Sequence, residues 1–130
     1  MEGMSITKKI LFYIEAHLDK ELTLEKLAEE LKYSKFYLAR TFKENTGTTL
    51  YKYIQGRRMD EAARKLAETE KPIVEIAFEA GYGSQQAFTK SFRDVYICTP
   101  QEYRKTGVFH PRHSRIYMHS IVWTESRSAA

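Results

Sequence analysis

One segment of this chain occurs twice, and the repeat limits the possible folds more than any other feature. Leu27-Ala28 recurs as Ile76-Ala77 at an offset of 49 residues, and Ser34 recurs as Ser84 at an offset of 50, because Gly83 is one additional residue. The further matching pairs are Leu31 and Ala80, Tyr33 and Tyr82, Leu38 and Phe88, Phe42 and Phe92, and Lys43 and Arg93. A helix, a tight turn and a second helix capped by serine form the helix-turn-helix arrangement. The repeat therefore predicts two helix-turn-helix units, with two ordinary helical hairpins as the alternative.

The spacing of apolar residues predicts an all-α fold of six or seven helices, with no strand before the tail. In the first helix the residues Ile6, Ile10, Tyr13, Ile14 and Leu18 recur at helical steps. The longest helix runs from Thr49 to about Glu68, and Gly56 within it predicts a slight bend. The predicted N-caps are Ser5, Thr23, Ser34, Thr49 and Ser84; the predicted stops are Gly47 and Gly81; and the predicted first helical residues are Pro72 and Pro100.

These elements divide the chain into four segments. Residues 1–47 form a first helix-turn-helix subdomain, 48–69 a linker helix, 70–106 a second helix-turn-helix subdomain, and 107–130 a basic tail. The buried line of the linker helix is predicted to be Leu50, Tyr53, Ile54, Ala62, Ala63 and Leu66. Lobes of about 50 residues are marginally stable on their own.

Composition excludes several classes of protein. The 130 residues are 42% hydrophobic and 29% charged, as in globular chains, and the net charge of +4 permits an anionic partner without demanding one. The single cysteine, Cys98, excludes a disulfide within the chain and is expected to be a packed side chain. No signal peptide and no apolar run of about 20 residues is present, so we expect a cytoplasmic protein with no membrane partner.

The outer face of each second helix carries the functional signal. The predicted exposed residues are Lys35, Phe36, Ala39, Arg40 and Lys43 in the first unit, and Gln85, Gln86, Thr89, Lys90 and Arg93 in the second. A solvated helix face normally mixes both signs of charge, whereas neither set contains a carboxylate. Arginine recognises guanine O6 and N7, glutamine recognises adenine N6 and N7, and threonine or phenylalanine can contact a thymine methyl group. The pattern indicates binding to double-stranded DNA.

The length of the linker helix indicates how such a chain reads DNA. About 19 residues at 1.5 Å per residue span roughly 28 Å, and one turn of the duplex is about 34 Å. With the width of the packed units added, one molecule can reach two successive major-groove segments without a palindromic site.

At these residues the chain resembles the AraC/XylS family of transcription regulators, most closely its short members of the MarA, SoxS and Rob kind. The resemblance covers Ile6 to Arg104. Its matching text is Leu24-Glu25-Lys26-Leu27-Ala28, Tyr33-Ser34-Lys35-Phe36, Phe42-Lys43, Gly47, Tyr53-Ile54, Arg57-Arg58, Ile76-Ala77, Gly81-Tyr82, Ser84-Gln85-Gln86, Phe88-Thr89, Ser91-Phe92, Thr99-Pro100 and Tyr103-Arg104.

The resemblance implies activation or repression of promoters, with RNA polymerase as a partner in the activating case. It places base contacts on Phe36, Ala39 and Arg40, and on Gln85, Gln86, Thr89 and Lys90. The sequence departs from the close relatives at three of these positions: Phe36 stands where they usually have tryptophan, Ala39 where they have glutamine, and Lys90 where they often have arginine. Ala39 offers only a methyl group, and Lys90 loses bidentate geometry and is expected to contact phosphate.

Two alternatives stay open: a DNA-binding fragment of a longer ligand-sensing regulator, and a helical protein-interaction module that uses Phe36 and Tyr37. We expect no enzyme and no cofactor, because the chain has no phosphate loop, no metalloprotease pair and no nucleophile motif. No small-molecule site is expected. His110, His113 and His119 form a weak metal motif, and a solvated tail is the preferred interpretation.

Overall fold

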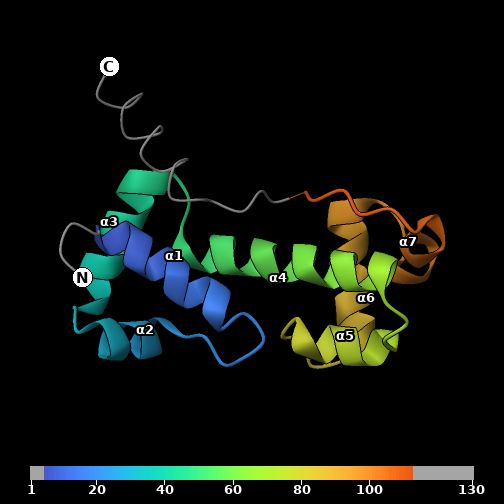
Figure 1. Ribbon diagram of the computed structural model, residues 1–130, viewed down its shortest axis with the longest axis horizontal. Helices are drawn as coiled ribbons and strands as arrows, with labels where there is room; N and C mark the ends of the chain where they lie inside the picture. Colours follow the sequence, from blue (N-terminus) through green and yellow to red (C-terminus); the bar gives the residue numbers. More distant parts are fainter. Residues whose placement is uncertain (1–4, 113–130) are drawn as a thin grey trace, which may run out of the picture. The chain divides into compact units, whose positions relative to one another are not determined.

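The computed structural model describes residues 5–112. Within this range the chain forms seven α-helices and no strand, which confirms the predicted all-α fold (Figure 1). The chain divides into two compact units, and the division falls between Ile54 and Gln55, inside helix α4 (Leu50–Glu68). No helix in the described range is long and apolar enough to cross a lipid bilayer.

In the first unit, α1 (Ile6–Ala16), α2 (Leu24–Leu31) and α3 (Lys35–Thr46) pack against one another and against the first residues of α4 (Figure 1). Each helix begins at its predicted N-cap. The hydroxyl oxygens of Ser5, Thr23 and Ser34 accept hydrogen bonds of 3.2, 3.0 and 3.1 Å from the backbone N–H three residues further on. Thr49 caps α4 in the same way at 3.1 Å. These side chains satisfy N–H groups that have no partner within the helix.

The core of the first unit is apolar, with one buried polar pair at its edge. Its buried residues are Ile10, Leu11, Ile14, Leu27, Leu38, Phe42, Leu50, Tyr53 and Ile54. Thr7 is also fully buried, and its hydroxyl accepts a 2.6 Å hydrogen bond from Nδ2 of Asn45. The prediction that Leu18 belongs to the first helix is wrong: α1 ends at Ala16, and Leu18 packs against the core from the following turn. The ring of His17 ends the helix by hydrogen-bonding the carbonyl of Tyr13 at 2.8 Å.

In the second unit, the remainder of α4 packs with α5 (Ile73–Glu79), α6 (Gln85–Tyr96) and α7 (Pro100–Thr106) (Figure 1). The buried residues are Met59, Ala62, Ala63, Leu66, Ile76, Ala77, Ala80, Phe88, Phe92, Tyr96 and Tyr103. Edge-on rings join α6 to α7, with ring centroids 5.4 Å apart for Phe92 and Tyr103 and 5.0 Å apart for Tyr96 and Tyr103. Cys98 packs against this core, and burial raises the pKa of its thiol, as expected for a packed side chain.

Pro72 and Pro100 were each predicted to be the first residue of a helix, and the prediction is correct only for Pro100. Pro100 is the first residue of α7, as predicted, and Thr99 and Glu102 form a reciprocal capping box around it. Pro72 precedes α5 as its N-cap residue, so the prediction that it is the first helical residue is wrong by one position. Its ψ of 141° is extended, while its carbonyl already accepts the N–H of Ile76 at 3.1 Å.

The first residues of the predicted tail are held against the second unit. The side chain of Phe109 packs against the core, and the N–H of His110 donates to the hydroxyl of Tyr103 at 2.9 Å. The N–H of Arg112 donates to Oδ1 of Asp60 at 3.1 Å. The apolar pattern fades after Gly107, but these backbone bonds hold His110 and Arg112 against the second unit. His113 and His119, named in the predicted metal motif, lie outside the described residues.

Candidate nucleic-acid interface

The turns that orient the two candidate recognition helices have the same construction. In the first unit Lys32 adopts the left-handed conformation at φ 63°, and the N–H of Tyr33 bonds to the carbonyl of Ala28 at 3.2 Å. In the second unit Gly81 has φ 93°, and the N–H of Tyr82 bonds to the carbonyl of Ala77 at 3.0 Å. The repeat in the sequence is thus a repeat in the backbone, and it brings α3 and α6 out of equivalent turns.

The structural repeat continues past Lys43 and Arg93 to the ends of the two helices. Helices α3 and α6 each have 12 residues, and each ends at a left-handed residue, Gly47 at φ 82° and Ile97 at φ 64°. Two residues later Thr49 and Thr99 cap the next helices. At the helix ends the sequence repeat is hidden, because glycine and isoleucine share no side-chain property although both adopt the same C-terminal cap, whereas Thr49 and Thr99 match at the offset of 50.

Burial settles which face of each helix points outward. Leu38 and Phe42 of α3 and Phe88 and Phe92 of α6 are fully buried. The opposite face carries the predicted set: eight of its residues are exposed, and Ala39 and Thr89 are partly buried at corresponding positions. Phe36 stands out, because 84% of its surface is exposed.

A shallow hollow lies along each outward face. The hollow on α6 is lined by all five predicted residues of that helix, Gln85, Gln86, Thr89, Lys90 and Arg93, together with Asp94. The hollow on α3 is lined by Phe36, Ala39, Arg40, Lys43, Glu44, Thr49 and Leu50. Lys35 does not line it. Sequence reasoning missed Glu44 and Asp94, which are equivalent carboxylates four residues after Arg40 and Lys90; extending the alignment of the repeat by one residue finds them.

The cations on these faces differ in whether they form ion pairs with other described residues. The side chains of Arg40, Lys43 and Lys90 form no ion pair with another described residue. Nζ of Lys35, in contrast, lies 3.3 Å from Oε2 of Glu25 on α2. The pKa of Glu25 is lowered, first by a backbone hydrogen bond at the start of α2 and then by Lys35. Both partners are exposed, so the pair is weak and open to competition from an anion.

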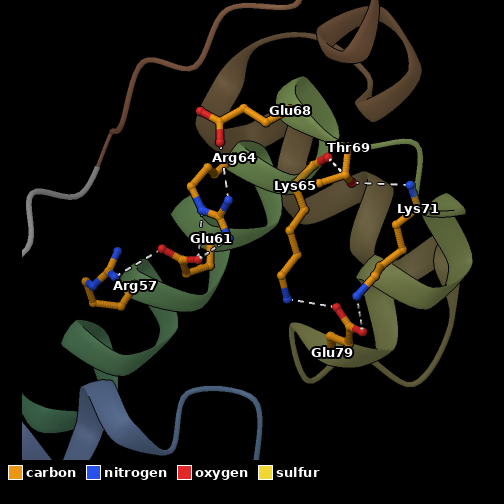
Figure 2. Close-up of polar contacts among 8 residues, drawn as sticks. All are labelled: Arg57, Glu61, Arg64, Lys65, Glu68, Thr69, Lys71 and Glu79. Atoms are coloured by element: carbon orange, nitrogen blue, oxygen red, sulfur yellow. Dashed lines mark hydrogen bonds and ion pairs between the residues drawn. The ribbon is translucent and has the colours of Figure 1, made fainter.

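Ion pairs and hydrogen bonds fix α5 and α7 against α4 and thereby support α6. Oε1 and Oε2 of Glu79 each lie 2.8 Å from a lysine Nζ, of Lys65 on α4 and Lys71 in the following loop (Figure 2). Arg104 of α7 donates from Nε to the carbonyl of Leu66 at 3.0 Å, and from Nη2 to that of Lys71 at 2.6 Å. On α4 itself a chain of ion pairs links Arg57, Glu61, Arg64 and Glu68 (Figure 2).

A buried carboxylate ties α4 to the C-terminal end of α6. Asp60 is fully buried, and its Oδ1 accepts hydrogen bonds from the hydroxyl of Tyr96 and from the N–H of Arg112. Burial, followed by the bond to Asp60, raises the pKa of the Tyr96 hydroxyl, which therefore remains a donor at neutral pH. The guanidinium of Arg112 lies 5.7 Å from the centre of the Tyr96 ring. These contacts hold the far end of α6 and leave its first turns facing outward.

Comparison with known proteins gives consistent results. Residues 27–106 match the family described as "Helix-turn-helix domain". The chain is 42% identical over 99 residues to the multiple antibiotic resistance protein MarA of Escherichia coli, covering 76% of this chain and 78% of MarA. It is 42% identical over 105 residues to the TetD protein of transposon Tn10 from Escherichia coli, covering 81% of this chain and 76% of TetD. Among solved structures, the C-terminal domain of AraT, a response regulator from Geobacillus stearothermophilus, superposes with a TM-score of 0.73 at 32% identity, covering 92% of this chain and 99% of that domain.

Proposed function

Because the chain belongs to the AraC/XylS family of helix-turn-helix transcription regulators, we propose that one molecule reads two adjacent major-groove segments of a promoter and activates transcription from it. The observation that carries the proposal is the repeated outward face. Helices α3 and α6 have equal lengths, equivalent turns and equivalent buried residues, and each presents a hollow whose lining includes at least two cationic side chains. Two recognition helices in one chain remove the need for a dimer and a palindromic site.

Each predicted residue has a proposed role that follows from its chemistry. The forked guanidinium of Arg40 suits O6 and N7 of a guanine, and the amide of Gln86 suits N6 and N7 of an adenine. Gln85 and Thr89 lie beside Gln86 on the same hollow and read the neighbouring bases. The cations Lys35, Lys43, Lys90 and Arg93 are assigned to phosphates, which fix the register of the protein without specifying sequence.

RNA polymerase is the partner proposed for activation, and the cytoplasm the proposed location. Transcription in vitro with purified polymerase and a template carrying the selected site tests activation. The proposal expects more transcript when the protein is added. A fall in transcript instead would make the protein a repressor at that promoter.

Binding to DNA is tested by selecting bound sequences from a random pool and measuring affinity for the selected duplex against salt concentration. Log affinity is expected to fall with log salt by about 0.9 for each phosphate neutralised. The selected site is expected to be asymmetric, with two specified segments about one helical turn apart, and to bind one molecule. A palindromic site that binds two molecules contradicts single-molecule reading. No binding at low salt contradicts DNA binding altogether.

Substitutions then distinguish the contributions of α3 and α6 to DNA binding. Arg40→Ala should weaken binding to the selected site by about 1–3 kcal/mol and relax preference at one base pair. Gln86→Ala should relax preference in the other segment only. Lys105→Ala, which removes a cation outside both hollows, is the control. If Arg40→Ala weakens selected and random DNA equally, Arg40 contacts phosphate and the base assignment fails.

A further inference from the structure

We propose that α3 reads the C5-methyl groups of pyrimidines, so that it accepts thymine and 5-methylcytosine and rejects uracil and unmodified cytosine. This inference rests on the proposed function and concerns the kind of readout that the first unit uses. In it, Phe36 and Ala39 recognise methyl groups and Arg40 alone recognises a base by hydrogen bonding. Helix α6 keeps a readout based on hydrogen bonds.

The first observation is the exposure of Phe36. An aromatic side chain with 84% of its surface in water is left outside the core, at the N-terminal turn of α3, on the face opposite the buried Leu38 and Phe42. It has no hydrogen-bonding group, so it can recognise only an apolar surface. Removing apolar surface from water is favourable in proportion to its area, and the ring gains this free energy only when a partner covers it.

The second observation is that two further side chains of the same hollow, Ala39 and Leu50, have no hydrogen-bonding group. Ala39 lies one helical turn after Phe36 on α3. At the corresponding positions of α6, Gln86 replaces Phe36 and Thr89 replaces Ala39, and both carry donors and acceptors. The two helices therefore present different chemistry from equivalent backbones.

The charges around the hollow identify DNA as its occupant. Two cations, Arg40 and Lys43, and one carboxylate, Glu44, line the hollow beside the apolar residues, and neither cation forms an ion pair with a described residue. An apolar surface bordered by a net positive charge suits a partner that places small apolar groups between phosphates. The major groove does this only at C5-methyl groups, which thymine carries and which 5-methylcytosine places at the same point of the groove.

The test uses the full chain and the selected site, with each thymine of the α3 segment replaced in turn by deoxyuridine, which lacks only the methyl group. Affinity is expected to fall about fourfold at one or two positions, the effect of one methyl group removed from a buried contact. At those positions a 5-methylcytosine–guanine pair is expected to bind more tightly than a cytosine–guanine pair, because neither Phe36 nor Ala39 hydrogen-bonds to the base.

Variants assign the effect to its residues. Phe36→Ala should bind thymine and uracil duplexes equally at its position, whereas Phe36→Leu should keep most of the difference. Gln86→Ala, the matched change on α6, should leave the uracil effect in the α3 segment unchanged. Because Phe36 lies outside the core, these variants are expected to fold, and their thermal unfolding verifies it.

Two results overturn the inference while leaving the proposed function intact. One is equal affinity for thymine and uracil duplexes at every position of the α3 segment; the other is a uracil effect that persists unchanged at every affected position in Phe36→Ala. Absence of any preference between the selected site and random DNA overturns the proposed function itself, so the two failures are distinguishable. Binding of an apolar peptide at Phe36 that leaves DNA affinity unchanged also overturns the inference.

Discussion

Removing the side chain of Arg104 should lower the stability of the second unit and leave the first unit unchanged. Its guanidinium donates to the carbonyl of Leu66 near the end of α4 and to the carbonyl of Lys71 in the loop before α5. A hydrogen bond from a charged donor contributes about 1.5–3 kcal/mol, and partial exposure places these two near the lower end. Water can reach the carbonyls in the variant, so Arg104→Ala should reduce the free energy of unfolding by about 2–3 kcal/mol. Arg104→Lys keeps the charge but cannot reach both carbonyls with a rigid fork, and should lose about half as much.

Urea unfolding followed by circular dichroism measures this loss. With a slope of about 1–3 kcal/mol per molar urea, the midpoint for Arg104→Ala should fall by roughly 0.7–3 M. Hydrogen exchange should speed up in α5, α6 and α7, because α7 contacts α6 through Tyr103 and Phe92, and should stay unchanged in α1 to α3. DNA preference should therefore weaken in the α6 segment alone. Wild-type stability in Arg104→Lys would show that the fork is not needed, and a loss in Arg104→Ala below about 0.5 kcal/mol would refute the contribution of both bonds.

Four further substitutions give distinct outcomes. Glu25→Gln should release Lys35 for a phosphate, so affinity at low salt should rise and the salt dependence steepen by about 0.9, as titrations at several salt concentrations measure. Gly47→Ala should destabilise by about 1 kcal/mol in thermal unfolding, since φ is +82° but the added Cβ meets no atom. Gly81→Ala should destabilise the protein more than Gly47→Ala, because at φ +93° the added Cβ also lies 3.2 Å from Nη1 of Arg58. Two lysines lower the pKa of Glu79 below its ordinary 4.5. Its contribution to the free energy of unfolding is therefore complete above pH 4.5 and is lost as acid protonates the carboxylate. Glu79→Gln should make the free energy of unfolding less sensitive to pH below 4.5, and an unchanged acid profile would contradict this.

The local features of the fold could be predicted from the sequence because they depend on neighbouring residues. A hydroxyl side chain three residues before a helical N–H, as at Ser34, is sufficient to define a cap. Apolar residues at helical spacing, as in Leu38 and Phe42, are sufficient to define the inward face and hence the outward one. The candidate interface was therefore largely visible in the sequence, except for the carboxylates Glu44 and Asp94 that border its hollows.

The remaining features depend on partners distant in the chain, and no local pattern indicates them. Arg104 bonds to carbonyls 38 and 33 residues away, and Asp60 meets the backbone of Arg112 across 52 residues. The left-handed conformations of Lys32 and Ile97 were equally hidden, because neither residue type favours positive φ. Only the repeat could have indicated them, since the counterpart of Lys32 at the offset of 49 is Gly81 and the counterpart of Ile97 at the offset of 50 is Gly47.

The comparison of the two units separates what the fold requires from what recognition requires. Backbone features are shared: the left-handed turn, the serine cap, the left-handed end and the threonine that starts the next helix occur in both. The fully buried residues of α3 and α6 occupy equivalent positions. On the outward face Phe36 corresponds to Gln86, and Arg40 to Lys90, and these pairs differ in chemistry. Exposed substitutions change stability little, so the fold does not dictate this divergence. The two units share a backbone arrangement but carry different outward side chains, so they suit a DNA site whose two segments differ in sequence. The asymmetry of the selected site, more than its affinity, therefore tests the proposal that one molecule reads two segments.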